Sequence, residues 1–600
     1  MLAPLPYLDE ATRMNEPVIG MLWGSFPCRE PPRKFGKLLS WGSVARTFTR
    51  SLSIAGRVVP YQPPQESASK DEQQQALASF LTSIDILWAD FYPATGPALR
   101  LRSELDLACP AMLVAGGTFP KGAEALLFPW QHLLRSDDAL LFSCRADQDM
   151  WRMLVEWAAL RQYVIPCPVD LEVFHPGSDV DKAVARAKYG LPVDSPVLLY
   201  VGRRNIQKNL HSLLCLFAKV RETVPDAHLC LVGEDDDIRL AEFAARNTGY
   251  RLWLESLADH LDIADGITIL EPLFGDDLAE VYRASDIVVN LSVYHRENFG
   301  LSQAEAQSCG VPVVCSDWGG FKDVVIHRQT GFLVDTVISK HGVRVDWQAG
   351  AYYVIQLLND DRLRTEMAER AMVWAQDEFA VSRIGSKLGH VVKDLWHPDA
   401  GTSRRTLGVA YKPSAFARQY EEHKRTCGWY TDGRMESTGA ARRYPPMFEG
   451  AHYALYETLM RPYATQLAAD LQLNGIQLWW IPYYPADVQL DPIRHIARDH
   501  DPIWPHERHL DPREWEVCRR IDGASSVHGV TQALNSGSLS VDSSESTLIL
   551  WHLFMEGFIL FDASSGGGNG AESPYEATVP DHHWGKGTIH SATARRSAPI

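Results

Sequence analysis

The feature that most limits the fold of this chain is a regular alternation of short apolar runs with longer helical stretches. Such runs, bounded by turn residues and separated by helical segments, are typical of parallel strands in βα units. They form two successive series, at 18–23, 84–88, 111–115 and 139–143, and then at 197–201, 228–232, 267–270, 287–291 and 311–315. The pattern predicts an α/β protein with two doubly wound parallel sheets, which bind ligands at the carboxyl ends of their strands.

Proline-rich stretches and changes in composition divide the chain into domains. A chain of 600 residues is too long for one hydrophobic core, since single cores stop growing at roughly 250–300 residues. Pro166, Pro168 and Pro176 lie between the two series and indicate an interdomain linker. The predicted parts are Rossmann-like domains at 1–170 and 171–385, a short helix at 386–400, a helical, aromatic-rich extension at 401–507, a small module at 508–562, and a disordered tail at 563–600.

Charge and cysteine usage exclude several classes of protein. The formal net charge of −17 provides no global basic field, so nucleic acid is not an expected partner. The 10 cysteines are scattered without a Cys-x-x-Cys pair, which favours reduced, buried thiols over disulfides or a zinc site. We find no export signal, and the longest apolar stretch, 548–561, is too short and too polar for a membrane helix. We therefore expect a soluble, cytoplasmic protein.

Cations follow the first strand of the second series. The strand ends at Gly202, where backbone can approach a ligand closely, and Arg203 and Lys208 stand at its exit. This pair could hold a diphosphate beside the next helix. A solvated basic turn explains the same residues equally well, because isolated Gly-Arg/Lys patterns are weak evidence.

A second constellation combines two carboxylates with a glycine loop. Ser302 and Glu305 have the spacing of a capping box and Gly310 that of a C′ stop, so a helix should start near Leu301. The amides of Phe299 and Gly300 would then be available to an anion. Glu297 and Glu305 could border one pocket, although Glu305 could instead satisfy a backbone donor.

Taken together, these motifs resemble the retaining GT-B glycosyltransferases of family four. The resemblance rests on Gly202-Arg203 with Lys208-Asn209, on Glu297 and Glu305 in a Glu-x7-Glu frame, and on Gly310-Val-Pro-Val-Val, Gly319-Gly320 and Thr330-Gly-Phe-Leu-Val. It implies two Rossmann-like domains facing a cleft, with the acceptor bound by the first and the donor by the second. A helix near Ser382–Trp396 would cross back onto the first domain.

The resemblance also implies a reaction and roles for single residues. A hexosyltransferase of this family moves a sugar from a nucleoside diphosphate sugar with retention of configuration, and needs neither a metal nor a cofactor besides that co-substrate. Arg203 and Lys208 would bind the diphosphate and stabilise the leaving group, Glu297 would contact the donor sugar, and Glu305 the ribose hydroxyls. Further donor contacts are expected at Gly202, Asn298, Phe299, Gly300 and Leu301.

The acceptor side departs from the family. Histidines that members often carry after two strands of the first domain are absent, and those strand ends hold Asp90 and Thr118. With Gly24, they are the acceptor-side candidates. Asp323 stands where glutamate is common. The acceptor, whether glycan, lipid, small molecule or peptide, is not determined by the sequence, and two rival functions stay open: phosphorolysis on the same fold, and a non-catalytic scaffold.

Other polar clusters have ordinary explanations. Asp235-Asp-Asp237 follows a strand and favours a solvated loop over a metal site, and the histidines at 495, 500, 506 and 509 are too irregularly spaced for a ligand set. The module at 508–562 resembles small winged-helix modules, including those that grip leader peptides. Its helix at 544–551 lacks Lys and Arg, so a protein or peptide partner is favoured over DNA.

Overall fold

The computed structural model describes residues 16–22, 37–65, 68–90, 95–115, 133–157, 160–235, 250–294, 297–339, 342–396, 411–426, 457–458, 460–465, 481–485, 488–499, 506–535, 541, 543–555 and 557–562. The chain forms two compact units, Met1–Ala469 and Asp470–Ile600. None of the helices in these ranges is long and apolar enough to cross a membrane.

The first domain is built on a parallel sheet of six strands in the order β2-β1-β3-β4-β5-β7. The four predicted strands are present, and the structure adds two at the edges that the sequence pattern did not reveal. The bounds are β1 Val18–Leu22, β2 Arg57–Pro60, β3 Ile86–Asp90, β4 Ala111–Val114, β5 Ala139–Phe142 and β7 Arg161–Val164. Helices between the strands are α2 Lys37–Ala55, α3 Lys70–Thr82, α4 Thr95–Glu104 and α6 Arg145–Leu154.

The second domain repeats this design with the order β10-β9-β8-β11-β12-β13. Its strands are β8 Val197–Val201, β9 His228–Val232, β10 Ile267–Leu270, β11 Ile287–Asn290, β12 Val313–Ser316 and β13 Gly331–Val334. They alternate with α7 Asp179–Tyr189, α8 Leu210–Thr223, α10 Tyr250–His260, α11 Gly275–Ala284, α12 Leu301–Ser308 and α13 Phe321–Val324, and α14 Trp347–Asn359 follows the hairpin β14 Thr336–Ser339 and β15 Gly342–Val345. The two sheets are those of a GT-B fold, as predicted.

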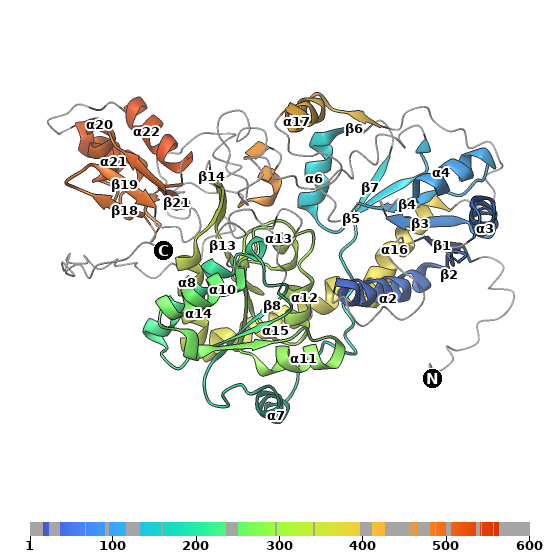
Figure 1. Cartoon of the computed structure of the whole chain (residues 1–600), viewed down its shortest axis with the longest axis horizontal. Coiled ribbons are helices and arrows are strands. Elements are labelled where there is room, and N and C mark those ends of the chain that lie inside the picture. The colour runs from blue at the N-terminus through green and yellow to red at the C-terminus, as the bar shows by residue number, and fades with distance from the viewer. Residues whose placement is uncertain are drawn as a thin grey trace, which may run out of the picture. The chain divides into compact units, whose positions relative to one another are not determined.

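The chain returns to the first domain after α15 Asp361–Phe379. The next helix, α16 Val381–Leu395, packs against α2, and Ile384, Leu388 and Val391 join the core of the first sheet (Figure 1). The crossover predicted for a helix near 382–396 is therefore confirmed, whereas the predicted domain bounds of 386–400 begin inside this helix and end beyond it. The helix begins directly after Ala380, since Phe379 still belongs to the core of the second domain, and it ends at Leu395.

Part of the extension joins the same unit. Strand β16 Tyr411–Pro413 pairs antiparallel with β6 Val155–Trp157, and α17 Ala415–Thr426 lies against α6. A short turn, η4 Arg461–Tyr463, also contacts α6. Helix α17 agrees with the helical prediction for 401–507, but β16 and the strands at 481–483, 488–491 and 496–499 do not. Most of the remaining residues of that range lie outside the described part of the chain.

The second unit combines a small sheet with three helices. Strands β18 Val488–Asp491, β19 Ile496–Asp499 and β20 His506–His509 form an antiparallel sheet, and α20 Pro512–Cys518, α21 Val527–Asn535 and α22 Ser543–Met555 follow. The predicted boundary at 508 was wrong, because it cuts through β20. At the end of the module, β21 Leu560–Asp562 pairs with β17 Ile481–Tyr483. Residues 563–600, predicted as a tail, lie outside the described residues.

Candidate active site

The order of strands in the second sheet determines where a ligand can bind. From β8 the chain adds β9 and β10 on one side and then returns to place β11 on the other side of β8. The connections that follow β8 and β11 therefore leave in opposite directions, and ligands of open α/β sheets bind at such a switch point, beyond the carboxyl ends of the strands. Both motifs found in the sequence lie on these two connections.

The connection after β8 is a tight turn that places Lys208. Asn205 caps a short 3-10 turn, Ile206–Lys208, by accepting the backbone N–H of Lys208 at 3.2 Å. Asn209 then adopts a left-handed conformation, with φ of 56°, and its amide donates to the carbonyl of Leu291 on the neighbouring connection at 3.0 Å. The base of the lysine is thus fixed to both connections at the switch point.

The cations beside Gly202 divide into two kinds. Arg204 is buried, and its guanidinium binds Asp235 at 2.8 Å and the carbonyl of Gly233. It joins the ends of β8 and β9, and Asp235 is thereby an ion-pair partner of arginine. Arg203 is only partly buried, and its carbonyl accepts the hydroxyl of Tyr200 at 2.9 Å. Arg203 is therefore the arginine of this turn that solvent can reach.

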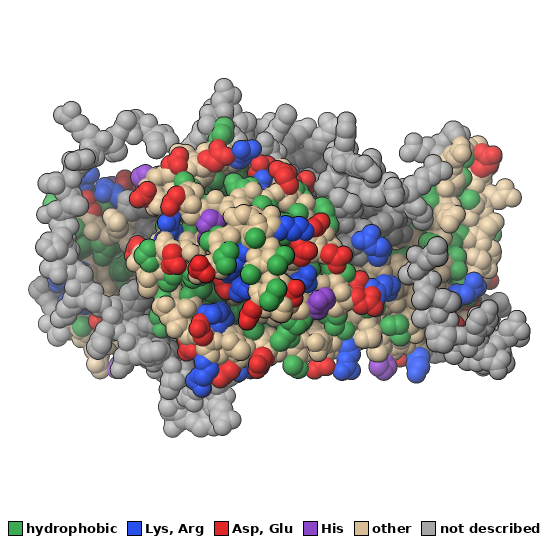
Figure 2. All heavy atoms as spheres, turned by 90° about the horizontal axis from the view of Figure 1, so that it is seen from below, with side chains coloured by type: hydrophobic (Ala, Val, Ile, Leu, Met, Phe, Trp, Pro, Cys, Tyr) green, Lys and Arg blue, Asp and Glu red, His purple; other side chains and the backbone are tan. Residues whose placement is uncertain are grey.

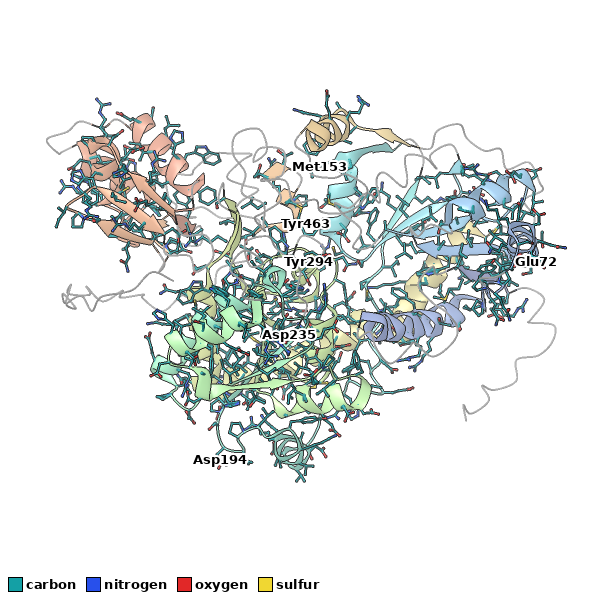
Figure 3. All side chains as sticks on the ribbon, in the orientation of Figure 1. Glu72, Met153, Asp194, Asp235, Tyr294 and Tyr463 are labelled. Carbon is teal, nitrogen blue, oxygen red and sulfur yellow. The ribbon has the colours of Figure 1, made fainter. Side chains whose placement is uncertain are left out.

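Lys208 and Glu297 meet across the switch point. The ammonium group of Lys208 forms an ion pair with Oε1 of Glu297, and the two side chains are 14% and 11% exposed. The ring of Tyr294 lies beside the same ammonium, with its centroid 5.6 Å from Nζ. The structure thus brings together two of the three residues expected to be catalytic, and Figure 3 labels Tyr294 at this place.

The loop that contains Gly319 and Gly320 packs against the backbone of Glu297. The N–H of Gly320 donates to the carbonyl of Glu297 at 2.9 Å. A Cβ atom at Gly319 would collide with that carbonyl, and one at Gly320 would lie 2.5 Å from the backbone of Phe299. Only glycines allow this approach, so the Gly319-Gly320 pair serves to hold the backbone of residues 297–299.

Helix α12 starts where the sequence predicts, but its first turn is formed in another way than the predicted capping box. Gly300, with φ of 104°, precedes the helix, and no side chain caps it. The predicted capping box was wrong, since the hydroxyl of Ser302 binds the side chain of Gln303 at 2.9 Å. The positive φ that turns the chain into the helix needs glycine and no cap. Phe299 is a core residue, whose ring packs edge-on against Phe379.

Glu305 is a buried carboxyl with a neutral partner. It is 7% exposed, and the hydroxyl of Tyr282 on α11 donates to it at 3.1 Å. Burial raises the pKa of Glu305 to about 8, because the charged form loses solvation. The structure thus places the side chain inside the domain, at hydrogen-bond distance from a phenol, and it neither closes a capping box nor pairs with a cation there.

The first domain reaches the same loop. Ser143, at the end of β5, donates to the carbonyl of Asn298 at 3.0 Å. The carboxylate of Asp323 accepts the N–H of Arg145 at 2.5 Å, at the start of α6, and pairs with its side chain at 2.9 Å. An anion at a helix N-terminus is stabilised by the helix dipole. These contacts, which the sequence did not indicate, fasten the second domain to α6.

The acceptor-side candidates are placed only in part. Asp90 is the last residue of β3, which lies next to β1 at the corresponding switch point of the first sheet. Gly24 and Thr118 lie outside the described residues. Across the described ranges, no three His, Cys, Asp or Glu side chains are grouped so that they could hold a metal ion.

Comparisons with known proteins identify the second domain. The sequence pattern of the family described as glycosyl transferases group 1 matches residues 181–374. A D-inositol 3-phosphate glycosyltransferase of Mycobacteroides abscessus is 36% identical over 206 residues, which are 34% of this chain and 43% of the relative. One from a Mycobacterium species is 33% identical over 282 residues, 46% of this chain and 58% of the relative.

The chain thus spans about half the length of these curated relatives. Among solved structures, HepE of Anabaena in complex with UDP and glucose is 17% identical, with a TM-score of 0.47, and the match covers 64% of this chain and 100% of that chain. The match at 181–374 contains the turn with Lys208, the loop with Glu297 and helix α12. The similarity to the glycosyl transferases group 1 family thus lies in the second domain, at residues 181–374.

Proposed function

We propose that this protein transfers a sugar from a nucleoside diphosphate sugar to an acceptor, with retention of configuration and without a metal ion. The observation that carries the proposal is the pairing of Lys208 with Glu297 across the switch point between β8 and β11. A cation and a carboxylate at that place offer the two charges that a sugar diphosphate requires.

The chemistry follows from where charge develops. As the bond from the anomeric carbon to the diphosphate oxygen breaks, negative charge grows on the diphosphate and positive charge on the sugar ring. Lys208 and Arg203 would stabilise the departing diphosphate, and the carboxylate of Glu297 would face the sugar. Amides at Phe299, Gly300 and Leu301, at the start of α12, would add hydrogen bonds to the phosphates, while Gly202 and Asn298 would border them.

Glu305 has a suitable environment for binding a sugar hydroxyl. Its carboxyl already accepts a hydrogen bond from Tyr282, and with a pKa of about 8 it can donate as well as accept near neutral pH. We assign it to the ribose of the nucleotide. The donor base, the transferred sugar and the acceptor are open parts of the proposal.

Ligand-dependent stabilisation tests the proposal. The melting temperature of the full chain should rise with at least one of UDP-glucose, GDP-glucose and ADP-glucose, because a ligand that binds only the folded state stabilises it. The same ligand should have a much smaller effect on the Lys208→Met variant. If none of the nucleotides shifts the melting temperature of the unmodified chain, the proposal is wrong and a scaffold function is favoured.

A role in peptide binding is favoured by one observation in the second unit. Strand β20 is an edge of the sheet β18-β19-β20, and an edge strand presents backbone groups to which an extended peptide can add. We propose that this module captures a peptide or protein partner. Peptides selected on the full chain from a display library should cross-link to a photoreactive residue at Glu507, which is exposed on β20. Cross-linking to the exposed Asp194 alone would contradict this role.

A further inference from the structure

A short segment of the extension is as deeply buried as the cores of the two domains. Met460, Tyr463 and Ala464 are 0% exposed, and Thr465 is 7% exposed. Residues 460–465, here called the clasp, lie more than 60 residues after α16 in the sequence, outside the family match at 181–374. Their burial shows that the clasp belongs to the body of the first unit.

The clasp is fixed by hydrogen bonds to the second domain. The N–H of Gly319 donates to the carbonyl of Tyr463 at 2.8 Å, and Lys322 donates to the carbonyls of Pro462 and Ala464 at 3.2 and 2.6 Å. Thr465 exchanges two hydrogen bonds with Thr336, the first residue of β14, at 3.0 and 2.7 Å. These contacts place the clasp directly on the loop that contains Gly319 and Gly320.

From Tyr463, one route of contacts leads to Glu297. A Cβ atom at Gly319 would lie 2.9 Å from the ring of Tyr463 on one side and would collide with the carbonyl of Glu297 on the other. The same carbonyl accepts the N–H of Gly320 at 2.9 Å. The glycine loop is thus held between Tyr463 and the backbone of Glu297.

A second route leads to Lys208. The ring of Tyr463 lies against that of Trp318, with centroids 5.8 Å apart. The indole N–H of Trp318 donates to the carbonyl of Tyr294 at 3.0 Å, and the ring of Tyr294 borders the ammonium of Lys208. Tyr463 is therefore linked to Glu297 through Gly319, and to Lys208 through Trp318 and Tyr294.

The clasp also touches the first domain. The hydroxyl of Tyr463 donates to the buried carboxylate of Asp147 on α6. The other end of α6 is held by Ser414, whose hydroxyl donates to the carbonyl of Met153 at 2.6 Å. In the view of Figure 3, Tyr463 lies between Met153 and Tyr294. The extension thus fastens both ends of one helix of the first domain.

We propose that Tyr463 is a positioning residue for the Lys208–Glu297 pair, so that the extension completes the donor site without contacting the donor. The ring and backbone of Tyr463 fix the loop of Gly319 and Gly320, and its hydroxyl anchors that loop to α6. This inference deepens the proposed function and rests on it, because it assumes that the ion pair acts on a sugar diphosphate.

Two variants of the full chain separate positioning from stability. Acceptor-free hydrolysis of UDP-glucose, GDP-glucose and ADP-glucose is followed by release of the nucleoside diphosphate, well below the melting temperature of each variant. Tyr463→Ala should lower kcat at least tenfold with less than a threefold change in KM. Tyr463→Phe keeps the ring and should stay within threefold of the unmodified kcat, although it melts earlier because Asp147 loses a partner.

A matched control and a second measurement complete the test. Leu357→Ala on α14 removes a buried side chain, 0% exposed, that takes part in neither route, and should leave kcat within threefold. Hydrogen exchange of the Gly320 amide should accelerate in Tyr463→Ala and not in Leu357→Ala. Equal losses of kcat in both alanine variants, or unchanged exchange at Gly320, would overturn the positioning role. If the unmodified chain hydrolyses none of the donors, the proposed function fails, and the exchange of Gly320 still decides whether Tyr463 fixes the loop.

Discussion

A fully buried ion pair in the first domain and the partly buried pair of Lys208 and Glu297 in the second are built for different purposes. Arg102 and Asp138 in the first domain are both 0% exposed and bind through two hydrogen bonds, at 2.6 and 3.0 Å. The guanidinium also donates to two carbonyls, and the carboxylate accepts the N–H groups of Ala111 and Arg135. Lys208 and Glu297 retain some exposure and meet through one oxygen. A fully buried pair that is held by several further hydrogen bonds stabilises a fold, whereas a pair that solvent still reaches can exchange partners with a ligand.

The largest expected effect on stability comes from breaking the fully buried pair of Arg102 and Asp138. Arg102→Ala would leave the charge of Asp138 buried without its cation, which typically costs about 3–5 kcal/mol. Chemical denaturation of the full chain should show this loss in the transition of the first unit. A loss below about 1 kcal/mol would mean that the pair is not the support that its geometry indicates.

The partly buried pair of Lys208 and Glu297 should behave in the opposite way. Glu297→Gln and Lys208→Met are expected to lower the rate of sugar transfer or donor hydrolysis by about 100- to 1,000-fold, the usual cost of losing one transition-state contact. Their stability should change much less than that of Arg102→Ala, because water solvates what remains. Normal turnover in both variants would remove this pair from the proposed active site.

Glu305 extends the comparison to a buried carboxyl beside a neutral phenol. Its pKa in the folded protein is raised from 4.5 to about 8. The protonated form is therefore the one that the fold favours, and the stability that it contributes is complete below pH 4.5 and is lost as the pH rises through about 8. The melting temperature of Glu305→Gln should thus match that of the unmodified chain near pH 5 and exceed it near pH 9. Parallel pH profiles of the two proteins would contradict this assignment.

The smallest effect on stability is expected at the ion pair of Arg145 and Asp323, which links the two domains. The side chain of Arg145 is 77% exposed and that of Asp323 is 17% exposed. Exposed ion pairs contribute about 0–1 kcal/mol, so Arg145→Ala should melt within a few degrees of the unmodified chain. A larger loss would indicate that the side chain, and not only its backbone N–H, holds α6 in place.

Much of the fold could be predicted because its strands are indicated by the pattern of apolar residues that are close in the sequence. The nine apolar runs of the two series became strands, since fully buried parallel strands need continuous apolar sequence. The edge strand β2, Arg57–Pro60, was missed, because its four residues are partly exposed or exposed and carry no such signal.

The site could be predicted only where its residues are close in the sequence. The motifs identified Lys208 and Glu297 separately, but their contact depends on the return of β11 to the side of β8. Tyr463 could not be found in this way, because it lies more than 160 residues after Glu297 in a segment without a motif. The capping box failed for another reason: Gly300 already provides the turn that a serine cap would have made.

The net negative charge of the chain does not determine the charge at any one place on its surface. On the face drawn in Figure 2, acidic and basic side chains of the described residues are interspersed. The overall charge of −17 therefore does not oppose the binding of a diphosphate at a local pair of cations, since screening confines such surface charges to about 8–10 Å.

The two places where the chain passes between the domains lie side by side. The N–H of Val169, in the linker, donates to the carbonyl of Phe379 at 2.8 Å, and Val169 and Ala380 form an isolated parallel bridge. Two adjacent covalent connections leave the domains little freedom to slide or twist apart. A hinge motion about Val169 and Ala380 would place its torsional changes in the few residues on either side of them. In such a rotation, the displacement of a residue grows with its distance from Val169 and Ala380, so the far ends of the domains would move furthest.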